Sequence, residues 1–163
     1  MYNATVMEHF QNPRNMGRIE DADMLIQVGD PGCGDSVLIF MKIDDDVLTD
    51  IKYKIYGCGA AIATSSMGSV LAKGKSLDEV LQLKDTDVTN ALGGLPAEKE
   101  HCSNLIASAF GFAPEEYFNL GGKTKWYGAA LARYAPEEFA ADPVMMCWPG
   151  GCGTVMISAS RDP

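Results

Sequence analysis

Three cysteines lie beside residue types that could complete a metal site. Cys33 and Cys58 each have a glycine on both sides, and Cys102 directly follows His101. Flanking glycines remove side-chain bulk from around the sulfur and let backbone N–H groups approach it, as a metal-bound thiolate requires. With Asp35 two residues after Cys33, the set offers three thiolates, one imidazole and one carboxylate. Such a set selects zinc, ferrous iron or an iron–sulfur cluster over magnesium or calcium.

These residue types also occur in other structural and functional roles. Any one of these cysteines could simply fill space, because cysteine is among the most buried residue types, but the combination favours a metal site. The chain contains no Cys-x-x-Cys pair, which argues against zinc-ribbon and thioredoxin-like sites. Cys147 and Cys152 have no histidine partner, and we interpret them as incidental cysteines of a turn. His9 is expected on the surface of a helix.

Composition limits the classes of function. The 163 residues suit one domain, and 47% hydrophobic with 21% charged residues is a globular balance. Five cysteines, an odd number, favour reduced thiols. A net charge of −9 argues against a nucleic-acid partner and suits a basic protein partner. The first fifteen residues lack the apolar segment of a signal peptide, and the uncharged run Ile55–Ala72 is too polar to span a membrane, so we expect a cytoplasmic protein without a membrane partner.

The elements that must position these residues form a pattern of strands first and helices afterwards. Strands are predicted at Met24–Val28, Val37–Ile43 and Val47–Tyr56, the last two joined as a hairpin by three aspartates. Helices are predicted at Tyr2–Gln11, after Gly59 up to Lys73-Gly74, and at Leu77–Leu83, Thr86–Leu92 and His101–Phe110. This order predicts an α+β fold in which helices pack on one face of a small three-stranded antiparallel sheet.

The last third of the chain gives a weaker pattern. Pro114 and Pro136 each precede two glutamates, as at a helix start, whereas further glycines and prolines interrupt any longer element. We therefore predict a domain at residues 1–110 and an irregular or helical extension at 111–163 that packs on the domain or trails from it.

Five segments of the chain, in order, carry a resemblance to a known family. They are Asn12-Pro13-Arg14-Asn15-Met16-Gly17, Pro31-Gly32-Cys33-Gly34-Asp35, Tyr56-Gly57-Cys58-Gly59-Ala60-Ala61-Ile62-Ala63, Gly74-Lys75-Ser76-Leu77-Asp78-Glu79 and Lys99-Glu100-His101-Cys102-Ser103. Across Tyr2–Ala109 the chain strongly resembles the IscU/NifU N-terminal scaffold proteins of iron–sulfur cluster assembly. The resemblance implies the IscU/SufE-like form of the fold and a non-enzymatic scaffold function.

The resemblance also implies a role for individual residues. Cys33, Cys58 and Cys102 match the ligand cysteines of the family, and either Asp35 or His101 would be the fourth ligand of iron in a [2Fe–2S] cluster. Cys102 would accept persulfide sulfur from an IscS/NifS-type cysteine desulfurase. Lys99 matches a lysine close to the family site, and Tyr2 matches a tyrosine tied to persulfide reduction or to contact within a homodimer.

Partners follow from the same resemblance. The completed cluster would pass to apo iron–sulfur acceptor proteins. Many bacterial members carry Leu-Pro-Pro-Val-Lys before the His-Cys pair, where an Hsp70-type chaperone binds, and this chain has Leu95-Pro96-Ala97-Glu98-Lys99 instead. The difference argues against a dedicated chaperone partner.

Two alternatives use the same residues. One is a zinc-bound, SufU-like sulfur-transfer protein in which Cys102 exchanges persulfide. The SufU group carries an insertion between its second and third cysteines, and the segment from Cys58 to Cys102 has no room for one, which favours the scaffold. The other is a domain whose zinc only holds the fold, where glycines around Cys33 and Cys58 would be unnecessary.

Overall fold

The centre of the fold is an antiparallel sheet whose strands follow one another along the chain. The computed structural model describes residues 1–30, 35–119, 126–127, 144–148 and 151–156. Strands β1 (Met24–Asp30), β2 (Asp35–Asp44) and β3 (Val47–Tyr56) pair in that order. Asp45 and Asp46 have φ of 51° and 59°, the left-handed values of a tight hairpin turn between β2 and β3. The three predicted strands and their hairpin are confirmed.

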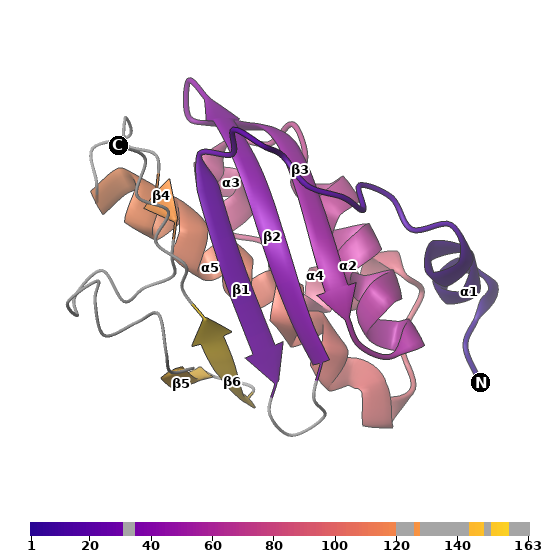
Figure 1. The fold of residues 1–163 in the computed structure, drawn as a ribbon. Helices are drawn as coiled ribbons and strands as arrows, with labels where there is room; N and C mark the ends of the chain where they lie inside the picture. The colour runs from indigo at the N-terminus through magenta and orange to yellow at the C-terminus, as the bar shows by residue number, and fades with distance from the viewer. Residues whose placement is uncertain (31–34, 120–125, 128–143, 149–150, 157–163) are drawn as a thin grey trace.

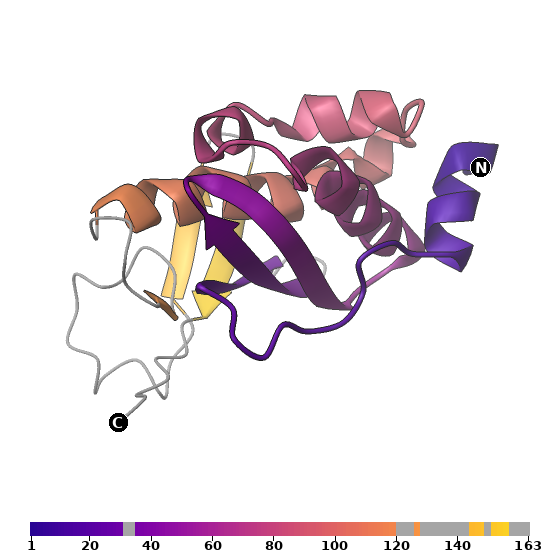
Figure 2. The ribbon, with the colours of Figure 1, turned by 90° about the horizontal axis from the view of Figure 1, so that it is seen from above.

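Helices cover one face of this sheet (Figures 1 and 2). They are α2 (Gly59–Ala72), α3 (Leu77–Leu81), α4 (Asp85–Ala91), the 3-10 helix η1 (Ala97–Cys102) and α5 (Ser103–Asn119), whereas α1 (Ala4–Gln11) lies at the side of this layer next to α2. Alternate strand residues such as Val37, Ile39 and Tyr53 are fully buried beneath them. The predicted α+β class, with a three-stranded antiparallel sheet and helices on one face, is confirmed.

α2 is a buried helix, as predicted for this uncharged run, and it lies at the centre of the helical layer. Its small residues allow a close approach of α5: a Cβ built on Gly68 would lie 2.7 Å from Cγ1 of Ile106. Ile106 is itself fully buried. Among the described residues, no helix is long and apolar enough to cross a membrane.

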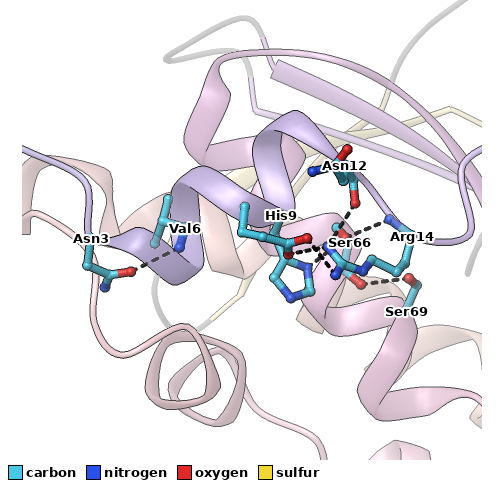
Figure 3. A network of polar contacts seen from close by, with 8 residues as sticks. Asn3, Val6, His9, Asn12, Arg14, Ser66 and Ser69 are labelled. Atoms are coloured by element: carbon cyan, nitrogen blue, oxygen red, sulfur yellow. Dashed lines mark hydrogen bonds and ion pairs between the residues drawn. The ribbon is translucent and has the colours of Figure 1, made fainter.

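α1 docks on α2 through a polar network that Figure 3 shows. Asn3 caps α1 by accepting a hydrogen bond from the Val6 N–H at 2.9 Å. Nδ1 of His9 shares a hydrogen bond of 2.8 Å with Oγ of Ser66, which also accepts one from the Arg14 N–H at 2.9 Å. His9 is only 8% exposed, so the prediction of a surface histidine is wrong. Its ring completes the packing of α1 against the polar side chains of α2.

The segment around His101 differs from its prediction. Instead of one helix at His101–Phe110, η1 ends at Cys102 and α5 continues to Asn119. Pro114 therefore lies inside α5 and does not begin a new helix. Phe110 and Tyr117, on either side of it, are both buried, and this packing offsets the hydrogen bond that a proline removes. The division predicted at residue 110 falls within α5 and stays a prediction.

Strands of the extension add to the free edge of the core sheet. They are β4 (Trp126–Tyr127), β5 (Val144–Trp148) and β6 (Gly151–Met156), and the resulting order is β3-β2-β1-β6-β5, with β4 also paired to β1. The sequence predicts irregular or helical structure here, and the strands correct that prediction. The glycines and prolines of this part hide the strand pattern, whereas the unpaired edge of β1 offers hydrogen bonds to any segment that reaches it.

Candidate metal centre

Asp35, Cys58 and Cys102 meet at one end of the core sheet. One ligand atom from each residue lies within 4.8 Å of the others. Asp35 begins β2, Cys58 is the N-cap residue of α2, and Cys102 ends η1. The predicted position of both cysteines at element ends is confirmed, and the three elements that carry the donors are far apart in the sequence.

The sulfur and oxygen atoms are close enough to share a ligand. The two Sγ atoms of Cys58 and Cys102 lie 3.7 Å apart. Oδ2 of Asp35 lies 3.6 Å from the Cys58 sulfur and 3.9 Å from the Cys102 sulfur. Two soft sulfur donors beside one carboxylate fit zinc, iron or an iron–sulfur cluster.

Backbone geometry holds the carboxylate in place. Oδ1 of Asp35 accepts a hydrogen bond from the Cys58 N–H at 3.1 Å. A Cβ built on Gly57 would lie only 3.0 Å from Cγ and Oδ1 of Asp35, so the close approach of β2 and the Gly57–Cys58 segment depends on a glycine. Gly57 therefore makes room for the carboxylate, whereas the sequence predicts only that it frees space around the Cys58 sulfur.

Burial differs among the donors. Asp35 is 5% exposed and Cys58 is half-buried, whereas Cys102 has no exposed surface. A persulfide acceptor should be a partly exposed thiol, whereas Cys102 is fully covered in this structure. Its carbonyl accepts a hydrogen bond from Oγ1 of Thr64 at 3.2 Å, so α2 packs directly over the end of η1 and covers the cysteine.

His101, Lys99 and Tyr2 lie around these donors. Nε2 of His101 is 3.6 Å from Sγ of Cys102. The charge of Cys58 is the largest cause that raises the pKa of Lys99, and Cys102, Tyr2 and Asp35 raise it further. Burial, followed by the charge of Cys58, raises the pKa of Tyr2, and Lys99 opposes this shift. The pKa values of Lys99 and Tyr2 thus both depend on the charges of the two cysteines.

One predicted ligand falls outside the described residues, and one residue of the observed site was not singled out in the sequence. Cys33 falls within residues 31–34, outside the described residues. Gly57 is the residue of the site that the sequence does not single out. It is the first glycine of Gly57-Cys58-Gly59, and the sequence predicts for it only free space around the Cys58 sulfur. Its contact with Asp35 joins residues 22 positions apart, which no local pattern specifies.

Comparisons with known proteins agree with this geometry. The family described as NifU-like N terminal domain matches residues 1–123. The chain is 52% identical over 123 residues to "Iron-sulfur cluster assembly scaffold protein IscU 1" of Archaeoglobus fulgidus, covering 76% of this chain and 80% of that protein. It is 41% identical over 121 residues to "Iron-sulfur cluster assembly enzyme IscU" of Drosophila melanogaster, covering 72% and 78%.

A solved structure supports the fold. The crystal structure titled "Putative iron-sulfur cluster assembly scaffold protein for SUF system" from Fervidobacterium islandicum superposes with a TM-score of 0.56 at 18% identity, covering 67% of this chain and 93% of that one. At this identity the likeness concerns the fold alone. The family match over residues 1–123 and the sequence identity to the IscU proteins together establish that the chain belongs to the NifU-like N-terminal domain family.

Proposed function

We propose that the protein is a scaffold on which an iron–sulfur cluster is assembled and from which it is transferred to apo-proteins. The observation that carries the proposal is the convergence of one carboxylate and two thiols within 4.8 Å. A cluster bound there is cargo, so its ligands must hold it and also release it. Relatives at 41–52% identity are named as IscU assembly proteins, which supports the same function.

Cys58 and Cys102 supply two of the ligands, and Cys33 supplies the third. Cys33 precedes Asp35 by two residues in the chain, next to a donor that already lies at the site. The fourth ligand is Asp35 or His101, both within 4 Å of the Cys102 sulfur. Three thiolates and one harder donor suit a [2Fe–2S] cluster that leaves the protein, because a carboxylate or imidazole binds iron less tightly than a fourth thiolate.

Sulfur arrives on Cys102 as a persulfide from a cysteine desulfurase. A thiol accepts sulfur only when a donor reaches it. Since Cys102 is buried, we infer that the end of η1 opens when the donor docks. Lys99 and Tyr2, whose pKa values respond to both cysteines, assist this exchange. The protein acts by holding reactants, not as an enzyme, and works in the cytoplasm.

A zinc-bound sulfur relay is the alternative. Its support is the same donor set, since two thiolates, a carboxylate and the imidazole of His101 supply the four donors of tetrahedral zinc. In that case the metal would stay in place and only sulfur would move through Cys102.

Anaerobic reconstitution distinguishes the two functions. The full chain is incubated with ferrous iron, cysteine, a cysteine desulfurase and excess dithiothreitol. A scaffold acquires visible charge-transfer bands and acid-labile sulfide, and both then move to an apo-ferredoxin. The variants Cys58→Ser and Cys102→Ser should lose the bands, whereas Cys147→Ser, outside the proposed ligand set, should keep them. Stoichiometric zinc without a chromophore would instead support the relay.

A further inference from the structure

η1 is a short surface helix whose buried residue is Cys102, at its last position. Glu98 and Glu100 of the same helix are exposed. The turn before η1 contains Gly93 and Gly94, whose φ values of 76° and 96° are left-handed. Glycine adopts such values without strain, and a few residues at the end of an element can serve as a hinge. A swing of η1 about this turn would uncover Cys102, as the proposed function requires.

Asn3, the N-cap residue of α1, contacts this turn through its side-chain nitrogen. Nδ2 donates hydrogen bonds to the carbonyl of Leu92 at 2.9 Å and to that of Gly94 at 3.2 Å. A Cβ built on Gly93 would lie 3.3 Å from the same nitrogen, so the amide lies directly against the turn. Leu92 is fully buried and is the C-cap residue of α4. The Asn3 amide therefore links α1 to the segment that leads from α4 into η1.

The oxygen of the same side chain has a different partner. Oδ1 of Asn3 accepts the hydrogen bond from the Val6 N–H that caps α1 (Figure 3). The oxygen thus stabilises α1, whereas the nitrogen holds the turn before η1. Aspartate and serine cap helices about as well as asparagine. A carboxylate donates no hydrogen bond, and a serine side chain lacks the amide nitrogen, so either substitution separates the two contacts of Asn3.

We propose that Asn3 is a positioning residue that holds η1 closed over Cys102. This inference rests on the proposed function, because it takes Cys102 as the thiol that a sulfur donor must reach. While Asn3 bonds the two carbonyls, the glycine turn keeps its place and η1 covers the sulfur. When these bonds break, the turn can rotate and η1 can move away from Thr64 of α2, which bonds the Cys102 carbonyl in the closed form. A partner that displaces the start of α1 therefore also frees η1.

The experiment measures how fast individual cysteines of the full chain are alkylated. Reduced protein without metal is treated anaerobically with dilute N-ethylmaleimide, and peptide mass mapping follows Cys102 and Cys58 separately. In Asn3→Ser, which leaves the charge unchanged, and in Asn3→Asp, the rate at Cys102 should rise by about ten-fold because two hydrogen bonds that oppose opening are lost. This rise corresponds to about 1.4 kcal/mol. The rate at Cys58 should not change, because α1 keeps its cap.

Ser76→Ala is the matched control for a general loss of stability. It removes the cap of α3, where Oγ of Ser76 accepts a hydrogen bond from the Glu79 N–H at 3.3 Å. The contacts of Asn3 are left as they are. Urea unfolding should show that this variant is less stable than the wild type, whereas its Cys102 should be alkylated at the wild-type rate.

The outcomes separate this inference from the proposed function. Alkylation of Cys102 at the wild-type rate in both Asn3 variants would overturn the inference. An equal rise in Ser76→Ala, or an equal rise at Cys58, would overturn it as well, because either indicates general loosening of the protein. The same proteins are then treated with inorganic polysulfide. If alkylation of Cys102 changes as expected but no protein carries additional sulfur on Cys102, the proposed sulfur acceptor is wrong and the positioning role of Asn3 stands.

Discussion

Asp35 connects the sheet to the first helix of the metal centre. Its two carboxylate oxygens contact different parts of Cys58, with Oδ1 accepting from the backbone N–H at 3.1 Å and Oδ2 lying 3.6 Å from Sγ. One side chain therefore orients the cysteine and offers a ligand of its own. A carboxylate holds iron less tightly than a thiolate. A substitution of Asp35 is thus expected to change the rate of cluster release.

Replacing Asp35 by Ala should lengthen the lifetime of the cluster. Without the carboxylate, the remaining donors hold the iron, and release to an apo-ferredoxin should slow by roughly ten-fold, the lower range of effects seen when groups around a metal are changed. The decay of visible absorption and the rate of transfer measure this effect. Asp78→Ala, which changes an exposed acid of α3, is the control. Transfer kinetics equal to those of the wild type would contradict the assigned role.

Gly57→Ala should weaken the same site through steric displacement. The added methyl group would lie 3.0 Å from the Asp35 carboxyl and 3.1 Å from Cβ of Ala61, so the carboxylate must move. Because the methyl group also presses on Ala61, the Gly57–Cys58 segment shifts together with its thiolate ligand, and we expect roughly ten-fold weaker iron binding. Gly111→Ala is a matched control, because nothing lies within 4 Å of its added methyl group and it is helical. That variant should bind iron normally and gain about 0.5–1 kcal/mol of stability. Equal iron affinity in both variants would refute the steric argument.

At the scale of elements, the contact of α2 with α5 determines where Cys58 and Cys102 meet, since each helix begins beside one of these cysteines. Gly68→Ala tests this contact. The new methyl group would lie 2.7–2.8 Å from two carbons of Ile106, which is fully buried and has little room to move. Overpacking of this kind costs about 1–3 kcal/mol. Urea unfolding should show the loss, with Gly111→Ala again as the control that does not lose stability.

The docking of α1 on α2 should depend on pH. Burial, assisted by the charge of Arg14 and opposed by Glu8, lowers the pKa of His9 below 6.5. Below pH 6.5 the unfolded chain therefore takes up a proton that the folded chain excludes. The contribution of neutral, buried His9 to the free energy of unfolding is therefore complete above pH 6.5. It is lost as the pH falls from 6.5 toward the lowered pKa, by at most about 1.4 kcal/mol per pH unit.

The pH effect is isolated by comparing two proteins. His9→Gln keeps a hydrogen-bonding group near Ser66 but does not titrate. Urea unfolding at pH about 7.5 and about 5.5 should show a larger loss of stability in the wild type than in the variant. A loss of equal size in both proteins would assign the pH dependence to other groups.

At the scale of the whole molecule, the net charge of −9 predicts docking on a basic surface of the sulfur donor. Raising the salt concentration screens such an attraction, so the dissociation constant for a cysteine desulfurase should rise by roughly ten-fold between about 50 and 500 mM salt. Glu98→Gln removes one charge from η1 beside the site and should weaken binding more than Asp78→Asn in α3. An affinity independent of salt would contradict electrostatic docking.

The sequence by itself determined the elements whose signals are local. Alternating residues from Val47 to Tyr56, the three aspartates before them and the glycines around Cys58 predict strand, hairpin turn and helix start, because each depends on neighbours in the chain. The same local patterns identified Cys58 and Cys102 as residues at element ends. Family motifs then indicated which of the five cysteines carry function.

Only the tertiary structure decided which distant residues meet. Asp35 and Cys102 are 67 positions apart in the chain, yet Oδ2 of Asp35 lies 3.9 Å from Sγ of Cys102. The burial of His9 and Cys102 comes from the packing of α2 against α1 and η1, and the pairing of Cys147 with Cys152 comes from the register of β5 on β6. Each of these depends on contacts between separate elements. Spacing along the chain does not specify them, because the same local pattern is compatible with many arrangements of the folded elements.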